Sequence, residues 1–257
     1  MGILNLTPDS FYDGGSYKNE SDIINQVEQM LAEGATFIDV GAYSSRPDAK
    51  HVSESEELAR ILPVVELLIK TFPKLILSID TFRSSIAKQC IEAGAAIIND
   101  ISAGQLDPLM LETVGKLKVP YIMMHMRGTP QTMQQHTNYS DLVKEMLFYF
   151  SERIALARQH GIIDMIVDPG FGFSKTREQN FELLNNLELL NLTELPILVG
   201  VSRKSMIYKT LGNSPQEALN GTTVINTISL QNGASILRVH DVKEAMECIT
   251  LVNALKQ

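Results

Sequence analysis

The sequence predicts one α/β domain over residues 1–257, a (β/α)8 TIM barrel in which eight parallel strands form a ring covered by helices. Two observations predict this fold class. Eight short apolar runs alternate with helical patterns from one end of the chain to the other, as in successive βα units. A pattern of helical stretch, glycine, short turn and apolar run recurs at Gly34, Gly94 and Gly233. A weak internal repeat of this kind suits a closed barrel.

An open doubly wound sheet is the alternative architecture. Proteins of that type carry a glycine-rich dinucleotide-binding turn after the first strand. No such fingerprint follows the first apolar run at 2–6. We therefore favour the barrel.

Each predicted strand is a short apolar run. The eight runs cover residues 2–6, 37–40, 75–80, 96–100, 121–124, 165–168, 197–200 and 236–239. Helices fill the intervals. Ser21 and Ser53 are placed to cap helix starts, and Glu56 follows Ser53 at the spacing of a capping box. Glycines follow several helical stretches, where left-handed helix ends are expected; they are Gly34, Gly94, Gly161 and Gly233.

Polar residues stand where these runs end. They are Asn5, Asp39, Asp80, Asn99 with Asp100, His125, Asp168, Ser202 to Lys204, and Arg238 with His240. In a parallel barrel the carboxyl ends of all strands lie on one face, so we expect these groups to converge on one mouth. Long loops at 7–20, 41–52 and 127–138 are expected to serve as lids or ligand loops.

Composition narrows the class of protein. The hydrophobic share of 44% supports one large core, and no apolar stretch reaches the roughly 20 residues that span a bilayer. We expect a cytoplasmic protein without membrane contact. A net charge of −8 disfavours nucleic acid, which needs a basic face. Cys90 and Cys248 lie far apart in helical patterns and predict core packing rather than a disulfide or metal site.

Asp80, Asn99 and Asp168 end three different strands and would point acceptor oxygens into one partly buried space. Buried carboxylates need donors, so a flat ligand edge with several N–H groups, as in guanine or a pterin, is a natural complement. The alternative is that each of the three side chains caps its own turn.

The string DPGFGF that begins at Asp168 predicts a tight loop with two aromatic rings beside the carboxylate, or a turn with buried phenylalanines.

Cationic residues follow the last two strands. Lys204 and Ser205 open a helix after the seventh run and predict a site for a carboxylate or phosphate. Arg238 and His240 are spaced to share one face, and Arg46 on the second loop would complete a phosphate cluster; a rim ion pair is the alternative for Arg238. Arg203 receives no ligand, and His125 is interpreted as a satisfied rim histidine rather than a base.

Asn5 ends the first run and leads into its long loop. Its amide oxygen is a suitable ligand for Mg²⁺, which typically completes its shell with water and substrate phosphate oxygens. An Asx turn before Pro8 is the competing interpretation. The residues alone do not choose between the two.

The motifs together resemble the dihydropteroate synthase family. The matching segments run in family order along the chain, and they are MGILNLTPDSF at 1–11, DGG at 13–15, DVG at 39–41, SSRP at 44–47, SIDT at 78–81, IIND at 97–100, MHM at 124–126, DPGFGF at 168–173, VSRKS at 201–205 and RVHD at 238–241. The resemblance implies condensation of 6-hydroxymethyl-7,8-dihydropterin diphosphate with p-aminobenzoate, which releases pyrophosphate and forms 7,8-dihydropteroate.

The resemblance also implies roles for individual residues. By family pattern the pterin would be held by Asp80, Asn99, Met124, Asp168, Lys204 and Arg238, of which Asp80, Lys204 and Arg238 are expected to matter most for catalysis. The diphosphate would be held by Asn5, Arg46, Arg238 and His240, with Mg²⁺ on Asn5. The p-aminobenzoate would be held by Ser45, Pro47, Phe173, Lys204 and Ser205.

The second loop departs from the family pattern, since Tyr43, Ser45 and Asp48 stand where many relatives have Glu, Thr and Gly. These changes are expected to alter the fit of sulfonamides, which mimic p-aminobenzoate.

The family also implies a homodimer through late helices, where 224–230 is apolar, although a core-facing stripe explains that segment equally well. Two rivals remain: a pterin-binding methyltransferase domain serving a corrinoid protein, and an inactive pterin-binding paralogue.

Overall fold

Parallel strands alternate with helices and lie in one sheet in their order along the chain. The computed structural model describes residues 1–6, 20–43 and 52–255. The strands of this part of the chain are β1 (Gly2–Asn5), β2 (Phe37–Gly41), β3 (Ile76–Asp80), β4 (Ile97–Asp100), β5 (Tyr121–Met124), β6 (Met165–Asp168), β7 (Ile197–Val199) and β8 (Ala234–Leu237). All seven neighbouring pairs are parallel.

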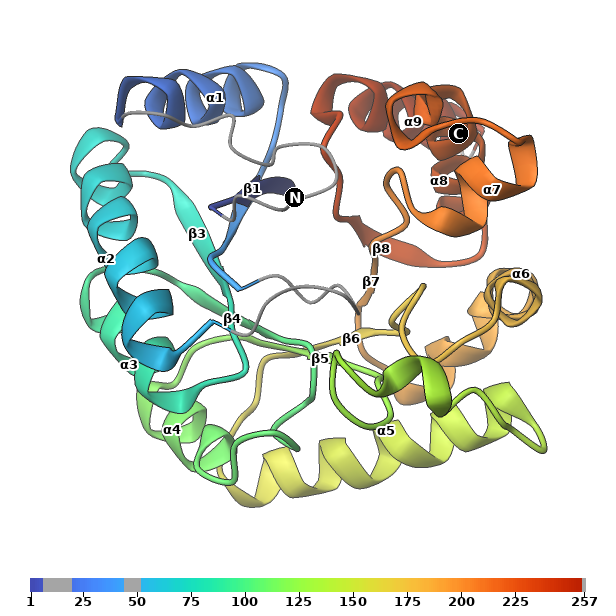
Figure 1. Ribbon diagram of the computed structural model, residues 1–257, viewed down its shortest axis with the longest axis horizontal. Coiled ribbons are helices and arrows are strands. Elements are labelled where there is room, and N and C mark those ends of the chain that lie inside the picture. The colour runs from blue at the N-terminus through green and yellow to red at the C-terminus, as the bar shows by residue number, and fades with distance from the viewer. Residues whose placement is uncertain (7–19, 44–51, 256–257) are drawn as a thin grey trace.

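Helices connect successive strands and lie outside the curled sheet (Figure 1). The α-helices of the described residues are α1 (Glu20–Ala32), α2 (Glu54–Thr71), α3 (Ser84–Glu92), α4 (Met110–Leu117), α5 (Leu142–Gln159), α6 (Arg177–Asn185), α7 (Ser205–Leu211), α8 (Leu219–Gln231) and α9 (Val242–Ala254). Short 3₁₀ turns are η1 (Met133–Gln135), η2 (Leu187–Thr193) and η3 (Pro215–Glu217). None of the helices in these ranges is both long and apolar enough to cross a membrane.

The sheet curls until its last strand approaches its first. Beyond the end of β8, Val239 forms an isolated parallel bridge with Gly2, and Ile3 N–H donates to the Val239 carbonyl at 2.9 Å. The seam is therefore a bridge rather than a full strand ladder. Eight parallel strands with intervening helices agree with the prediction, and closure of the ring is less complete than predicted.

The eighth strand corrects one predicted boundary. Seven strands lie within one residue of their predicted ends, but β8 is Ala234–Leu237 rather than 236–239. The left-handed turn at Gly233, with φ of 100°, allows pairing with β7 to begin at Ala234. Arg238 and His240 consequently lie beyond the end of β8, although the Arg238 N–H still donates to the Val199 carbonyl at 2.9 Å.

Helix ends follow the sequence signals in part. Ser53 caps α2 by accepting from the Glu56 N–H at 3.2 Å, but the Glu56 carboxylate pairs with Arg60 instead of completing the capping box. Ser21 lies inside α1 and is not its cap. The four glycines predicted to end helices all have positive φ, which confirms the left-handed ends.

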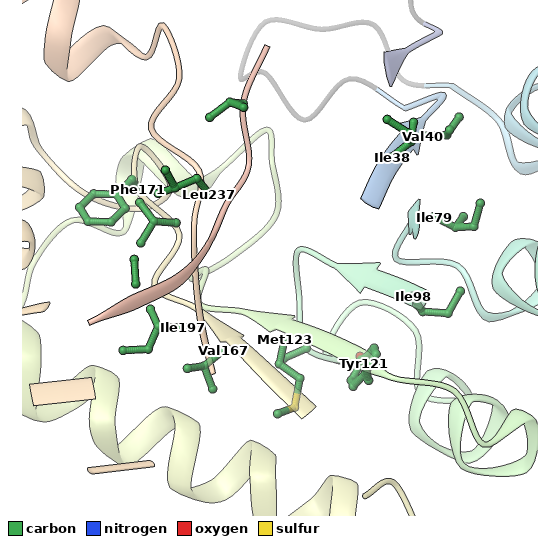
Figure 2. Close-up of a cluster of buried hydrophobic side chains, with 14 of the residues drawn as sticks. Ile38, Val40, Ile79, Ile98, Tyr121, Met123, Val167, Phe171, Ile197 and Leu237 are labelled. Carbon is green, nitrogen blue, oxygen red and sulfur yellow. The ribbon is translucent and has the colours of Figure 1, made fainter. Parts of the chain in front are cut away.

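Alternation along the strands separates two apolar layers. Outward-facing residues pack between the sheet and the helices, and Figure 2 shows this layer running from Ile38 through Ile98 and Val167 to Leu237. A smaller cluster of Ile97, Ile122 and Leu198 lies inside the ring. Because side chains alternate between faces, the next inward residues on these three strands are Asn99, Met124 and Gly200. On β2 and β3 the inward residues near the carboxyl ends are Asp39, Ser78 and Asp80.

Candidate active site

Asp39 on β2 is the centre of the inward polar layer. It is fully buried and accepts from Ser78 Oγ at 2.5 Å and from Asn99 Nδ2 at 3.0 Å. Arg238 Nε also donates to it at 2.6 Å. Three donors from three different segments compensate the buried carboxylate, as a charge removed from water requires.

Arg238 joins Asp39 to Asp80. Its NH2 group donates to Asp80 Oδ2 at 2.9 Å, and about a fifth of each side chain is exposed. Burial opposes the guanidinium charge, but Asp39 and Asp80 outweigh it and raise the pKa of Arg238. Burial also raises the pKa of Asp80 to about 7, although Arg238 acts in the opposite direction. The predicted rim ion pair of Arg238 exists, and it lies within the polar layer.

Lys204 and Asp168 complete the cluster from the opposite strands. Burial lowers the pKa of Lys204 to about 8, while Asp168 opposes this. Burial raises the pKa of Asp168, and Lys204 opposes that shift in turn. A Cβ atom added at Gly200 would lie 3.9 Å from Lys204 Nζ and 4.0 Å from Arg238 Cδ. These are ordinary van der Waals distances, so Gly200 borders both cations without deciding their positions. The charges of the four residues act on one another, so they lie in one cluster, and the space beside it is the candidate ligand site.

The loop after β6 brings an aromatic ring to this space. Phe173 is partly buried and packs in a cluster with Met124, and Lys204 Nζ lies 5.0 Å from the centre of its ring. Lys204 also donates to the Phe171 carbonyl at 2.6 Å. Phe171 is fully buried in the outer core. Of the two rings predicted beside Asp168, only Phe173 is therefore placed to meet a ligand.

Residues that follow β7 and β8 are bonded to each other. Ser202 Oγ lies 2.9 Å from His240 Nδ1 and accepts from the His240 N–H at 3.2 Å. Burial, followed by the neighbouring Arg238, lowers the pKa of His240 to about 3. The imidazole is therefore neutral at physiological pH, so it can offer a polar contact to a diphosphate but not the positive charge that the sequence suggested.

Arg203 holds the loop after β7 against the next helical segment. Two of its nitrogens donate to Asp241 at 2.9 Å, and NH1 donates to the carbonyls of Pro215 and Gln216 at 2.9 and 2.7 Å. The side chain is buried. These contacts agree with a structural residue that takes no ligand. Ser205 begins α7 directly after Lys204, next to the charged cluster.

Two strand-end residues do not join the mouth. Asp100 points to the outer side, where Tyr121 donates to it at 2.6 Å and the Ser102 and Gly104 N–H groups donate at 2.8 and 2.7 Å. His125 is buried against the Tyr149 ring at 4.8 Å. Adjacent residues on a strand face opposite sides, so only one member of the Asn99–Asp100 pair can point inward. Convergence of every strand-end group was therefore too broad a prediction.

Part of the predicted site belongs to the second loop. Ser45, Arg46, Pro47 and Asp48 of that loop lie outside the described residues. Asn5 ends β1 and is half-buried, so its amide lies at the same end of the sheet as the charged cluster. Within the described ranges, no three His, Cys, Asp or Glu side chains form a group that could hold a metal ion.

Sequence reasoning missed the roles of Asp39 and Lys175. Asp39 was noted as a strand-end residue, yet no partner was inferred because its donors come from positions 39, 60 and 199 residues away. Lys175 follows the DPGFGF string as an ordinary loop lysine in the sequence, but the structure buries it. Period-two counting from Ile38 would have placed Asp39 inward; no local signal identifies Lys175.

Comparison with known proteins decides the family. A family model described as pterin binding enzyme matches residues 1–240. This chain belongs to the pterin-binding enzyme family. Within the family it is similar to the dihydropteroate synthase of Synechocystis sp. (44% identity, covering 99% of this chain and 89% of that protein). The resemblance inferred from the motifs is thereby confirmed over nearly the whole chain.

Solved structures of family members give the same result. A Yersinia pestis dihydropteroate synthase structure with a sulfonamide drug complex has a TM-score of 0.96 and 43% identity, covering 100% of this chain and 93% of that one. A Xanthomonas albilineans dihydropteroate synthase structure with 4-aminobenzoic acid has a TM-score of 0.91 and 37% identity, covering 100% and 92%. The fold of this chain is therefore that of the pterin-binding dihydropteroate synthases.

Proposed function

We propose that this chain condenses 6-hydroxymethyl-7,8-dihydropterin diphosphate with p-aminobenzoate to give 7,8-dihydropteroate and pyrophosphate in folate biosynthesis. The observation that carries the proposal is the meeting of Asp80, Asp168, Lys204 and Arg238 around one space in a member of this family. These residues combine carboxylate acceptors for a polar ring edge with cations for an anionic leaving group.

The pterin site is the polar layer around Asp39. Asp80, Asn99 and Asp168 offer acceptors from β3, β4 and β6, while Met124 belongs to the neighbouring apolar cluster. In the absence of ligand, Arg238 occupies one oxygen of Asp80. A bound pterin that donates N–H groups to the acidic residues would replace solvent there and leave Arg238 over the ring face.

The diphosphate site is assigned to Asn5, Arg46, Arg238 and His240. Arg238 provides a positive charge that Asp39 and Asp80 keep protonated, and neutral His240 adds a hydrogen bond. The Asn5 amide oxygen would hold Mg²⁺ together with diphosphate and water oxygens, the kind of shell that this ion typically takes. When bound, the ion would supply a Lewis acid that stabilises the leaving diphosphate.

The p-aminobenzoate site is assigned to Phe173, Lys204 and Ser205, with Ser45 and Pro47 from the second loop. Phe173 and Lys204 are 5.0 Å apart, ring centre to nitrogen, so an aromatic acid can stack on one and place charge near the other. The 4-aminobenzoic acid reported with the Xanthomonas albilineans relative supports this substrate class.

The reaction needs no strong protein base. The arylamine nitrogen is neutral at physiological pH and attacks the methylene carbon after the carbon–oxygen bond to the diphosphate has largely broken. Pyrophosphate leaves with the bonding electrons, and the acidic arylammonium proton passes to solvent. Arg46 and Arg238 stabilise the charge that grows on the leaving group, and the electron-rich dihydropterin ring supports positive charge at the methylene in a dissociative step.

Pyrophosphate release tests the proposed reaction. We expect release only when the pterin diphosphate, p-aminobenzoate and Mg²⁺ are all present, and we expect Asp80→Ala to abolish it while the fold is kept. Asp164→Ala, at an exposed residue, is the matched control and should retain activity. Full activity of Asp80→Ala would remove the pterin assignment.

Binding of the pterin without turnover would favour the inactive paralogue. The methyltransferase alternative has no use for the diphosphate cations, and the similar proteins are named for synthase activity.

We also propose a closed (β/α)8 barrel that acts as a cytoplasmic homodimer. Closure is supported by the Gly2–Val239 bridge and the Val239 N–H to Met1 carbonyl bond of 3.0 Å. The dimer is supported by exposed apolar residues on α8 and α9, Val224 at 50% and Leu251 at 70%. Sedimentation should give a dimer that Leu251→Glu converts to monomer; an unchanged mass would place the contact elsewhere.

A further inference from the structure

Lys175 is a buried lysine next to the candidate active site. Its side chain is 3% exposed, and it stands directly before the residue that caps α6, Thr176. Lysine is almost never fully buried unless its charge is compensated. Three acceptors compensate the charge of Lys175, and their positions in the fold indicate the role of the residue.

The three protons of the Lys175 ammonium each have an acceptor. Nζ donates to the Gly170 carbonyl at 3.0 Å and to the Phe173 carbonyl at 2.9 Å. It lies 3.1 Å from His125 Nδ1, and burial, followed by Lys175 itself, keeps the pKa of His125 well below its usual value. A neutral imidazole with its proton on Nε2 accepts at Nδ1, so all three donors are used.

The two carbonyls bracket the loop after β6. Between them Phe173 N–H donates to the Gly170 carbonyl at 3.0 Å, and Lys204 donates to the Phe171 carbonyl. Gly170 and Gly172 have φ of 68° and 82°, so the loop has an unusual backbone shape. Lys175 holds the Gly170 and Phe173 carbonyls, and Lys204 holds the Phe171 carbonyl, so two lysines fix three carbonyls of this loop.

We propose that Lys175 is a positioning residue that fixes the 170–173 loop and thereby places the Phe173 ring beside Lys204 for the arylamine substrate. The proposal rests on the proposed function for its kinetic consequence, but its structural part stands on the contacts alone. Lys175 has no described contact with Asp80 or Asn99, although its charge and that of Asp168 influence each other. The pterin half of the site should therefore depend on Lys175 less than the arylamine half does.

The lysine is an unfavourable group to bury, which makes a substitution informative. Burial lowers the pKa of Lys175 to about 7, and Asp168 only partly opposes this. Replacing it with Met, which is apolar and of similar length, removes that desolvation cost but leaves the Gly170 and Phe173 carbonyls without their Lys175 donor. The gain and the loss oppose each other. The fold should therefore survive while the loop loses its contacts.

Lys175→Met tests the proposal in two independent ways. Hydrogen exchange of a peptide covering 168–176 should become about tenfold faster or more, the scale of losing hydrogen bonds to a charged group, while β4 peptides stay unchanged. The KM for p-aminobenzoate should rise about tenfold or more, and the KM for the pterin diphosphate should rise by a clearly smaller factor. Lys116→Met, at a lysine whose side chain is 73% exposed, is the matched control.

Each outcome decides a different statement. Unchanged loop exchange, or equal rises in both KM values, overturns the positioning role. If Lys175→Met does not fold, Lys175→Gln, which keeps two donors without the charge, takes its place with the same criteria. An inactive wild-type protein would refute the proposed function, while the exchange measurement would still decide whether Lys175 holds the loop.

Discussion

At the scale of single residues, the site depends on one fully buried carboxylate that holds several of its other side chains. Asp39 is fully buried and pairs with Ser78, Asn99 and Arg238. A buried ion pair is stable only while both members are present, because a remaining charge without its partner is costly. Hydrogen bonds to Asp39 therefore fix the orientation of Arg238 and of the Asn99 amide.

Asp39→Asn should lower kcat/KM by about 100-fold or more, the scale of losing a buried charge partner. The amide cannot accept from three donors as a carboxylate does, so Arg238 would shift toward Asp80. Pyrophosphate release and circular dichroism measure activity and fold. Ser78→Ala removes only a neutral donor and should cost about tenfold or less. Equal effects of the two changes would contradict the central position of Asp39.

The activity should depend on pH through two groups with opposite requirements. Asp80 accepts from the pterin only when ionised, so raising the pH through its pKa of about 7 increases kcat/KM. Lys204 binds the arylamine carboxylate only when protonated, so kcat/KM falls as the pH rises through its pKa of about 8. The pH profile of kcat/KM should be bell-shaped.

Lys204→Arg is the control for the alkaline limb. Lys175 also loses its proton in this range, and arginine stays protonated throughout. The part of the limb that belongs to Lys204 should therefore disappear in the variant, even where its maximum activity is lower. An unchanged alkaline limb would assign the titration to Lys175 or to the substrate.

At the scale of elements, the β6 loop and strand β5 are fitted together at Gly170. A Cβ atom there would lie 2.2 Å from the His125 carbonyl oxygen, and φ is 68°. Ser174 also donates to the Arg127 carbonyl at 2.9 Å and accepts from the Arg127 N–H at 2.8 Å. The loops after β5 and β6 are therefore joined by a close backbone approach and by two hydrogen bonds.

Gly170→Ala should destabilise the protein by about 2 kcal/mol or more, because strain at positive φ adds to a clash with backbone that cannot move aside. Gly212→Ala is the matched control: its φ is 71°, but nothing lies within 4 Å of an added Cβ. It should cost about 1 kcal/mol. Urea denaturation of both variants measures the difference, and equal midpoints would argue against the tight fit at Gly170.

At the scale of the whole molecule, the outer apolar layer links helices and strands into one cooperative core. Cys90 on α3 and Cys248 on α9 are both buried, and they lie far apart in the sequence. Burial raises the pKa of the Cys90 thiol to about 12. Both thiols are therefore shielded until the packing around them opens.

Neither cysteine should react with a thiol reagent in the native protein at pH 8, and both should react after unfolding in urea. Because one core spans the strands, the urea midpoint for thiol exposure should coincide with the midpoint from circular dichroism. Cys90→Ala and Cys248→Ala assign the two reactions separately. A thiol that reacts well before the circular dichroism transition would indicate a helix that opens independently.

Much of the fold and part of the site could be predicted from local sequence. Short continuous apolar runs placed seven strands within one residue, because a parallel strand buried on both faces is apolar along most of its length. The order of βα units predicted that Asp80, Asn99, Asp168, Lys204 and Arg238 would share one end of the sheet. Each of these inferences uses only neighbouring residues and the general geometry of parallel strands.

The tertiary structure decided which groups are paired and which are charged. The pairing of Arg238 with Asp39 joins residues 199 positions apart, and the burial of Lys175 depends on carbonyls whose direction no residue type encodes. His240 is neutral because of what surrounds it. Sequence determined the fold, the family and the chemical types at the mouth, whereas protonation and partner choice depend on distance and desolvation, which exist only once the chain is folded.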